Sequence, residues 1–173
     1  MTRPGWDRYF MNIAHEVGKR MTCDRVSRGI GAVLVANQCH IIGTGYGGSP
    51  PGAPHCDEVG HLMVNGHCVR TIHAEVNALA HCARHGVATA ATTLYVTTQP
   101  CFNCAKLLVA GGVQQVIFED LYHHLDETAR VLELEKAVDI RFYRLTLRDE
   151  RWPLHDSRSE GVQYLFRAVD GTV

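Results

Sequence analysis

The stretch TLYVTTQPCFNCAKLLVAGG, residues 93–112, decides the fold because it joins a strand to a helix through two cysteines. Residues 93–98 are rich in β-branched and aromatic side chains, a composition typical of a β-strand. Residues 105–110 are typical of a helix, which stops at a Gly-Gly pair that suits a left-handed C-terminal cap. Cys101 and Cys104 are therefore expected where a strand runs into the N-terminus of a helix.

The two cysteines are well placed to bind a metal ion. They lie three positions apart, so both thiols point to the same side of the first helical turn. Pro100 stands just outside the helix, where its missing N–H costs nothing. The free N–H groups and the positive end of the helix dipole favour the thiolate form, which is the form that binds metals.

The triplet His73-Ala74-Glu75 supplies the second half of the predicted site. The apolar residues at positions 76, 79, 80 and 83 fall on one helical face, and Gly86 closes this helix. One imidazole and two thiolates hold a zinc ion with its fourth position open for water, which is the arrangement of catalytic zinc. We therefore predict that His73, Cys101 and Cys104 bind zinc and that Glu75 carries protons to and from the reacting groups.

The alternative is that the two halves are unrelated. A Cys-x-x-C pair in a cytosolic protein also occurs as a redox motif, and a single His is usually a surface or satisfied core residue. A redox motif needs no His-x-Glu upstream, however, and here each half stands at a predicted helix start. The joint pattern favours a catalytic zinc site.

Composition indicates one compact, intracellular domain. The chain has 173 residues, 46% of them hydrophobic, which suffices for one well-buried core. We assign residues 1–147 to this domain and residues 148–173 to a C-terminal tail of unknown role. The seven cysteines are an odd number, and no secretory segment is apparent near residue 1, so we expect reduced thiols and a cytoplasmic location.

The net charge and the hydropathy of the sequence indicate which kinds of substrate or partner the protein can bind. The formal net charge is −1 and the basic residues are dispersed, which disfavours nucleic acid as a substrate, although a compact basic pocket would not be visible in this count. The longest apolar runs, such as residues 32–36, are far too short to span a membrane. A small soluble substrate is favoured.

The remaining pattern predicts a three-layer α/β/α fold with a five-stranded mixed sheet. A helical period over residues 6–17 is followed by two strands, a long loop rich in Gly, Pro, His and Cys, and then the two site helices with a strand between them. We expect the helices that carry the zinc ligands to pack side by side on one face of the sheet. The other predicted elements are strands at 29–35, 39–43, 115–118 and 140–145, a loop at 43–70 and a helix at 126–137.

Several motifs together resemble the deoxycytidylate (dCMP) deaminase family of the cytidine and deoxycytidylate deaminase superfamily, including its late-competence-protein branch. His-x-Glu with Pro-Cys-x-x-Cys is the signature of zinc-dependent nucleobase deaminases. The likeness covers residues 5–123 and includes Trp6-Asp7-x-Tyr9-Phe10-Met11, Gly31-Ala32-Val33, Gly45-Tyr46-x-Gly48-x-Pro50 and the run from Cys68 to Glu75. It implies a cytidine deaminase-like fold and zinc-dependent hydrolysis of dCMP to dUMP. Members of this family are usually homo-oligomers, and some respond to dCTP and dTTP as effectors.

The resemblance also implies which residues meet the substrate. Tyr122 resembles the aromatic residue that stacks on the pyrimidine, and Tyr46 and Ala74 belong to substrate-facing motifs. Gly47 stands where the family usually has an Asn that hydrogen-bonds the nucleoside, and a missing polar contact of this kind costs about 1–3 kcal/mol. Arg25, Arg28 and Ser49, near the expected mouth of the site, are candidates for binding the phosphate.

A second group of metal-binding residue types gathers before the first strand and in the long loop. Some family members carry a second, structural zinc in equivalent regions, and Cys23, Cys56, His61 and His67 are our candidate ligands. The other interpretation is a loop that is rich in His for solubility and contains buried thiols. Both interpretations remain open from the sequence.

Three functions are compatible with these residues. The first is hydrolytic deamination of dCMP to dUMP with release of ammonia, in which Glu75 shuttles a proton to N3 of the ring and then to the leaving group. The second is deamination of another amino-heterocycle, such as a modified cytosine nucleotide or a free base, which Gly47 keeps open. The third is a non-catalytic nucleotide-sensing partner protein, against which the intact Glu75 argues because a sensor needs no proton shuttle.

Overall fold

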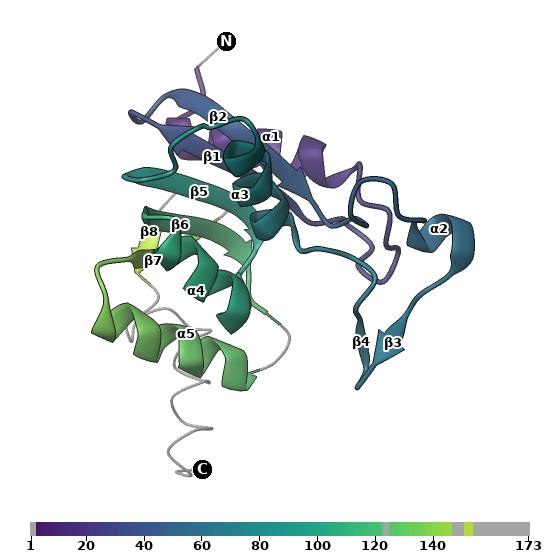
Figure 1. The fold of residues 1–173 in the computed structure, drawn as a ribbon. Coiled ribbons are helices and arrows are strands. Elements are labelled where there is room, and N and C mark those ends of the chain that lie inside the picture. The colour runs from purple at the N-terminus through teal and green to yellow at the C-terminus, as the bar shows by residue number, and fades with distance from the viewer. Residues whose placement is uncertain (1–2, 123–124, 147–150, 154–173) are drawn as a thin grey trace.

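The computed structural model describes residues 3–122, 125–146 and 151–153. The predicted succession of helices and strands is confirmed, with short additional elements in the long loop and near the C-terminus (Figure 1). The elements are α1 (Trp6–Gly18), β1 (Gly31–Ala36), β2 (His40–Tyr46), α2 (Cys56–Val59), β3 (Met63–Val64), β4 (His67–Cys68), α3 (Ala74–Arg84), β5 (Thr92–Thr98), α4 (Phe102–Ala110), β6 (Val113–Asp120), α5 (Leu125–Ala137), β7 (Arg141–Leu145) and β8 (Arg151–Pro153).

The main sheet is mixed, as predicted, and has the strand order β2-β1-β5-β6-β7-β8. β1 runs antiparallel to both β2 and β5, whereas β5, β6 and β7 are parallel to one another. β8 extends the five predicted strands by pairing antiparallel to β7. This strand comes from the segment that we set apart as a tail, whose residues 148–150 and 154–173 lie outside the described part of the chain.

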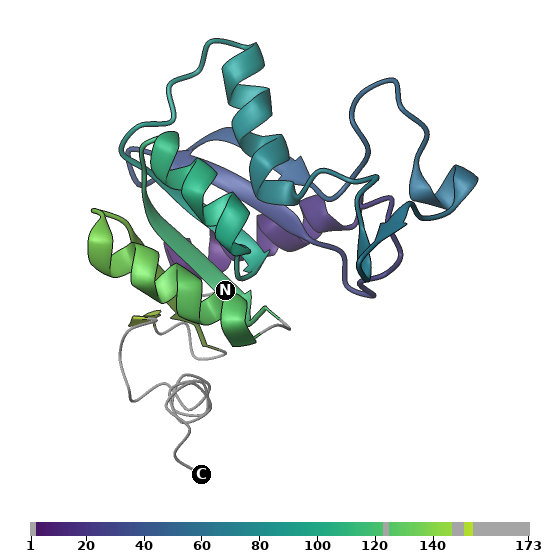
Figure 2. The same ribbon diagram turned by 60° about the horizontal axis from the view of Figure 1, so that its bottom comes forward.

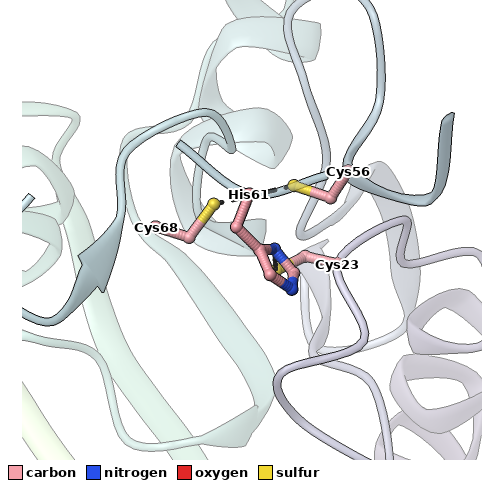
Figure 3. Close-up of side chains that lie close together, drawn as sticks. All are labelled: Cys23, Cys56, His61 and Cys68. Carbon is pink, nitrogen blue, oxygen red and sulfur yellow. Dashed lines mark hydrogen bonds between the residues drawn. The ribbon is translucent and has the colours of Figure 1, made fainter. Parts of the chain in front are cut away.

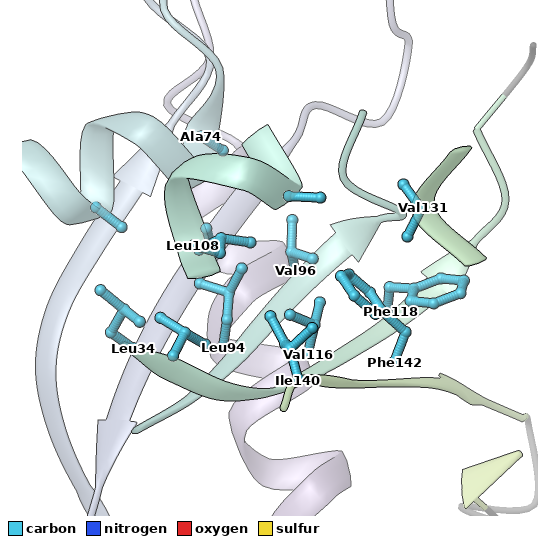
Figure 4. Close-up of a cluster of buried hydrophobic side chains, with 14 of the residues drawn as sticks. Leu34, Ala74, Leu94, Val96, Leu108, Val116, Phe118, Val131, Ile140 and Phe142 are labelled. Carbon is cyan, nitrogen blue, oxygen red and sulfur yellow. The ribbon is translucent and has the colours of Figure 1, made fainter. Parts of the chain in front are cut away.

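The sheet is covered on both faces, which gives the three layers (Figures 1 and 2). Successive side chains of β5 point to opposite faces of the sheet. Leu94 and Val96 join the core beneath α3, α4 and α5, shown in Figure 4, whereas Tyr95 joins the core beneath α1. Because both faces are buried, the middle of each central strand carries consecutive apolar or aromatic side chains, as at residues 94–96 of β5 and 116–118 of β6. Among the described residues, no helix combines the length and apolarity that crossing a membrane would require.

The long loop differs from its prediction in two ways. β2 continues to Tyr46, and the segment that follows contains α2 and a two-stranded ribbon in which Met63 pairs with Cys68. Asn65 and Gly66 connect the two strands of the ribbon with φ angles of 48° and 78°. An Asn-Gly pair with positive φ at both positions is a strong hairpin signal, so this turn was readable from the sequence.

The elements α2, β3 and β4 form an arm that projects beyond the edge of the sheet (Figures 1 and 2). Its apolar side chains are largely exposed and add little to the core: Val59, Leu62, Met63, Val64 and Val69. The arm therefore needs other interactions to hold it in position.

A close approach of α3 to β2 sets the position of the first predicted site helix. A Cβ atom added at Gly45 would overlap the carbonyl oxygen of Ala74 and the amide nitrogen of Ala78. Only a glycine lets the helix backbone lie this close to the strand.

Gly45→Ala should therefore destabilise the protein by about 1–3 kcal/mol, because backbone atoms cannot move aside as a flexible side chain can. In a chain of this size each kcal/mol corresponds to roughly 2–4 °C in Tm, measurable by thermal denaturation. Gly5→Ala is the matched control, since an added Cβ there meets nothing within 4 Å. Equal Tm values for the two variants would contradict the proposed close packing.

Candidate active site and second metal cluster

His73, Cys101 and Cys104 converge where two helices begin side by side. The Nδ1 atom of His73 lies 3.6 Å from the Sγ atom of Cys101 and 3.4 Å from that of Cys104. The three potential ligand atoms all lie within 4.8 Å of one another. An imidazole and two thiols at this spacing can hold one metal ion.

The geometry follows from the position of these residues at the helix ends. His73 is the N-cap of α3 and Cys101 is the N-cap of α4, and both have extended backbones with φ angles of −67° and −66°. Neither side chain caps its own helix, so both are available to a ligand. Because His73 precedes the helix, it need not diverge from Glu75 as two residues inside a regular helix would.

The thiol pair is electrostatically prepared for a cation. The hydrogen bond from Cys104, assisted by His73, lowers the pKa of Cys101 to about 4, and the same hydrogen bond raises the pKa of Cys104. The hydrogen bond with Cys101 raises the pKa of His73 to about 9. The hydrogen bonds among these three groups are made by protons that a bound metal cation would displace, since metal ligands must be deprotonated.

Glu75 lies in the first turn of α3 and is only 3% exposed. Burial raises the pKa of its carboxyl group, while the nearby His73 works in the opposite direction. The Cys104 thiol hydrogen-bonds to this carboxyl group, so Glu75 adjoins the ligand set without belonging to it. A buried carboxyl group of raised pKa holds a proton more readily than an exposed one, which suits a group that carries protons.

Two polar side chains that the sequence analysis missed hold the site together. The backbone N–H of Phe102, at the start of α4, donates to Glu127 of α5 over 2.7 Å, which supplies a cap that Cys101 does not. Gln99 is buried, and its Oε1 accepts from the backbone N–H of Tyr122 and from the hydroxyl of Thr128. The partners are separated by more than 20 positions, so no local sequence signal could reveal these contacts.

A cavity opens beside the ligand set and reaches Glu75. It is lined by His73 and Glu75 together with four of the residues that we predicted for substrate binding, namely Arg25, Gly47, Ala74 and Tyr122. The other residues of its wall are Met21, Cys23, Val26, Ile30, Gly66, His67, Cys68, Thr71, Thr98 and Gln99.

The remaining predicted substrate residues lie outside this wall. The carbonyl oxygen of Tyr46 accepts a hydrogen bond from Asn77 of α3 over 2.7 Å, so this residue ties the end of β2 to the helix. Arg28 is exposed, and Ser49 is buried with its hydroxyl unpartnered. These three residues are close to the site in the sequence, but they do not line the cavity.

Gly47 faces the side chain of Met21. A Cβ added at Gly47 would lie 3.2 Å from the Sδ and Cε atoms of Met21. The thioether sulfur accepts a hydrogen bond from the backbone N–H of Ile30 over 3.1 Å, which holds it against the wall. Part of the space that an Asn side chain would need is thus already filled.

The second cluster joins the arm to the segment after α1 (Figure 3). It consists of Cys23, Cys56, His61 and Cys68, whose ligand atoms lie within 4.8 Å of one another. The Sγ atoms of Cys56 and Cys68 are 3.6 Å apart, and the Sγ atom of Cys23 is 3.7 Å from Nδ1 of His61. All seven cysteines are free, and three thiols with one imidazole form a ligand set typical of structural zinc.

Cys68, and not the predicted His67, is the fourth member of this cluster. The two residues are neighbours on β4, and successive side chains of a strand point to opposite sides, so only one of them can face the cluster. Burial opposes ionisation of Cys68, but hydrogen bonds from the backbone of Arg70 and Leu62 outweigh it and lower its pKa to about 6. The second nitrogen of His61, Nε2, lies 3.0 Å from an Asp24 oxygen, which orients the ring.

Comparisons with known proteins agree with this geometry. The family described as cytidine and deoxycytidylate deaminase zinc-binding region matches residues 4–120. ComE operon protein 2 of Bacillus subtilis is 42% identical over 148 residues, which cover 80% of this chain and 77% of that protein. The deoxycytidylate deaminase of Mycobacterium phage D29 is 37% identical over 130 residues, which cover 68% of this chain and 97% of that enzyme.

The fold is also found among solved structures. The dCMP deaminase from the cyanophage S-TIM5, in complex with dCMP and dUMP, superposes with a TM-score of 0.68. The match covers 83% of this chain and 99% of that structure at 24% sequence identity.

The second cluster leads to a prediction about metal content. Cys68→Ser should lower the metal content of the purified protein from two ions to one per chain, because it removes a ligand. His67→Gln should retain two ions. Elemental analysis of both variants measures this, with circular dichroism to confirm folding. Loss of an ion in the His67 variant alone would instead assign the ligand role to that residue.

Proposed function

This chain belongs to the cytidine and deoxycytidylate deaminase family, and we propose that it hydrolyses dCMP to dUMP and ammonia with a zinc ion held by His73, Cys101 and Cys104. The observation that carries the proposal is the meeting of these three ligands with the buried Glu75 on the wall of one cavity. Three protein ligands leave one coordination position for water, as catalytic zinc requires.

A zinc ion bound by these residues would polarise a water molecule and make it a nucleophile at neutral pH. The contribution of the protein is to keep its ligands deprotonated at two helix N-termini, where the free N–H groups favour negative charge. Glu127 fixes the start of α4 and therefore the positions of the two thiolates.

Glu75 moves the protons in the proposed reaction. It accepts a proton from the attacking water and delivers it to N3 of the pyrimidine. It then takes the remaining proton from the hydroxyl group attached to C4 and delivers it to the leaving amine, so that C4 becomes a carbonyl carbon. The C4–O bond forms, the C4–N bond breaks, and the nitrogen departs as ammonia. Its burial beside the ligands supports this role because a desolvated carboxylate holds a proton more readily than an exposed one.

The cavity wall supports a nucleotide as substrate. We assign stacking on the base to Tyr122, the floor beneath the base to Ala74 and Gly47, and a phosphate contact to Arg25, all of which line the cavity. Tyr46, Arg28 and Ser49 are left out of this assignment because they lie outside its wall. Homo-oligomer formation and a response to dCTP or dTTP are expectations from the family, and a cytoplasmic location is an expectation from the odd number of cysteines.

We assign the second cluster to a structural zinc ion held by Cys23, Cys56, His61 and Cys68. Four protein ligands fill the tetrahedral positions, so no position is left for catalysis. The ion would fasten the arm, which buries little apolar surface of its own.

A second candidate function is deamination of a different amino-heterocycle. It is favoured by Gly47 and Met21, which together make this part of the wall apolar where the family usually has an Asn. A panel of cytosine, cytidine, deoxycytidine, CMP, dCMP and dCTP, assayed by ammonia release, tests both candidates. The highest kcat/KM for dCMP supports the proposal, and negligible turnover of dCMP beside a good alternative substrate overturns it.

Glu75→Gln should lower kcat by at least about 100-fold, the usual contribution of a positioned acid or base. The amide has nearly the same shape as the carboxyl group but cannot carry the proton. Zinc content and Tm, measured on the same preparation, should stay close to those of the natural protein. Undiminished turnover would refute the assigned role.

Gly47→Asn should lower kcat/KM for dCMP, because the new side chain must displace Met21 from its contact with Ile30. Overpacking of about 1 kcal/mol or more corresponds to a loss of roughly five-fold or more. Adding Met21→Ala should recover activity by making room for the amide, with Met21→Ala alone as the control. An improvement in the Gly47→Asn single variant would show that the space is already sufficient.

A further inference from the structure

We propose that His81 and His85, at the C-terminal end of α3, bind one divalent transition-metal ion between their imidazole rings. The divalent ions that suit imidazole ligands include Ni²⁺, Cu²⁺ and Zn²⁺. This site is separate from the two predicted zinc sites, and the inference does not depend on the proposed deaminase activity.

The two histidines lie one helical turn apart. Side chains at positions i and i+4 are neighbours on a helix, and here the ring centres are 4.7 Å apart with the ring planes inclined by 51°. Two imidazoles in adjacent coordination positions, each bound to the metal over about 2.1 Å, have ring centres roughly 4.5–5 Å apart. The rings of His81 and His85 therefore already have a separation that suits a shared ion.

Both rings are available to a ligand. His81 and His85 are exposed. Apart from their contact with each other, neither ring has a hydrogen-bond or ion-pair partner in the described part of the chain. The rings of His15 and His61, in contrast, are paired with carboxylates. Because exposed side chains change rotamer within nanoseconds, the two free rings can turn their nitrogen atoms toward one ion.

The end of the helix favours a cation. α3 ends at Arg84, and His85 is its C-cap, where the negative end of the helix dipole attracts positive charge. Arg84 opposes this attraction, but it is exposed and its long side chain can keep the guanidinium group in solvent. Cys82 is turned away, since it is buried and its thiol donates to the carbonyl oxygen of Ile42 over 3.6 Å. The ligands that this turn offers are therefore the two imidazoles.

The pair is remote from the predicted active site. α3 begins on the side of the arm and ends away from it (Figures 1 and 2). His81 follows His73 by eight positions, which corresponds to about 12 Å along a helix. Neither His81 nor His85 belongs to the described wall of the cavity that contains Glu75. An ion at this pair would thus be distinct from the catalytic zinc ion.

Two protein ligands make this site different in kind from the other two. Water fills the remaining coordination positions, so the ion exchanges more readily than one enclosed by four protein ligands. The ion joins two successive turns at a helix end, which is where helices fray. Because the unfolded chain does not hold the two rings together, binding should favour the folded state.

The first experiment measures Ni²⁺ binding by calorimetry on protein whose two zinc sites are loaded and whose exchangeable metal has been removed by dialysis. The natural protein should bind one further ion per chain. His81→Gln and His85→Gln should each weaken this binding by roughly 100-fold, because the second imidazole binds a metal ion already held by the same helix. If each single variant instead retained the affinity of the natural protein, the shared site would be refuted.

The second experiment changes the spacing and keeps the number of imidazoles. Ala83 is exposed, so Ala83→His combined with His85→Ala moves one imidazole to position i+2, which does not face His81. This double variant should bind Ni²⁺ as weakly as His85→Gln. An affinity equal to that of the natural protein would show that the ion is not held across one helical turn.

The third experiment controls for another exposed pair of metal-binding residue types. The Sγ atom of Cys39 lies 3.2 Å from Nδ1 of His40, and both residues are exposed. The variant Cys39→Ser with His40→Gln should keep the Ni²⁺ affinity of the natural protein. Ni²⁺ should also raise the Tm of this variant and of the natural protein, but not that of His85→Gln. Loss of Ni²⁺ binding in the Cys39 and His40 variant alone would overturn the inference.

Discussion

The structure depends on bringing two helix N-termini to one point. α3 and α4 lie side by side on the sheet, and each begins with a residue whose extended backbone turns its side chain toward the other helix. His73 and Cys101 occupy equivalent cap positions, and Cys104 follows within the first turn of α4. The short distances among the three ligand atoms and the position of Glu75 beside them follow from this meeting of helix ends.

Several contacts between distant parts of the chain hold the N-termini of α3 and α4 in position. Gly45 lets α3 lie directly on β2, Asn77 binds the carbonyl oxygen of Tyr46, and Glu127 caps the start of α4 from the neighbouring α5. None of these residues is a metal ligand. Together they provide the rigid support that a catalytic arrangement requires, because small displacements of ligands and proton carriers cost much of the rate.

The arm extends this arrangement to the entrance of the cavity. Its ribbon and short helix bury too little apolar surface to be stable alone, and four ligand-type side chains take the place of a core. Small domains often use a metal in this way when burial is insufficient. Because Cys23 and Cys68 also line the cavity, the second cluster and the cavity share part of one wall.

The local pattern of the sequence determined much of this protein. Strand and helix periodicity identified the five main strands and the principal helices, and the spacing of His73, Glu75, Cys101 and Cys104 indicated a zinc site, since each of these signals operates within a few residues. The choice of Cys68 over His67 depended on the phase of β4, which the Asn65-Gly66 turn sets. Met21 against Gly47, Glu127 at the start of α4, and β8 at the edge of the sheet are contacts between distant segments. Sequence spacing reports which residues share a face of one element, but only packing in three dimensions decides which faces meet.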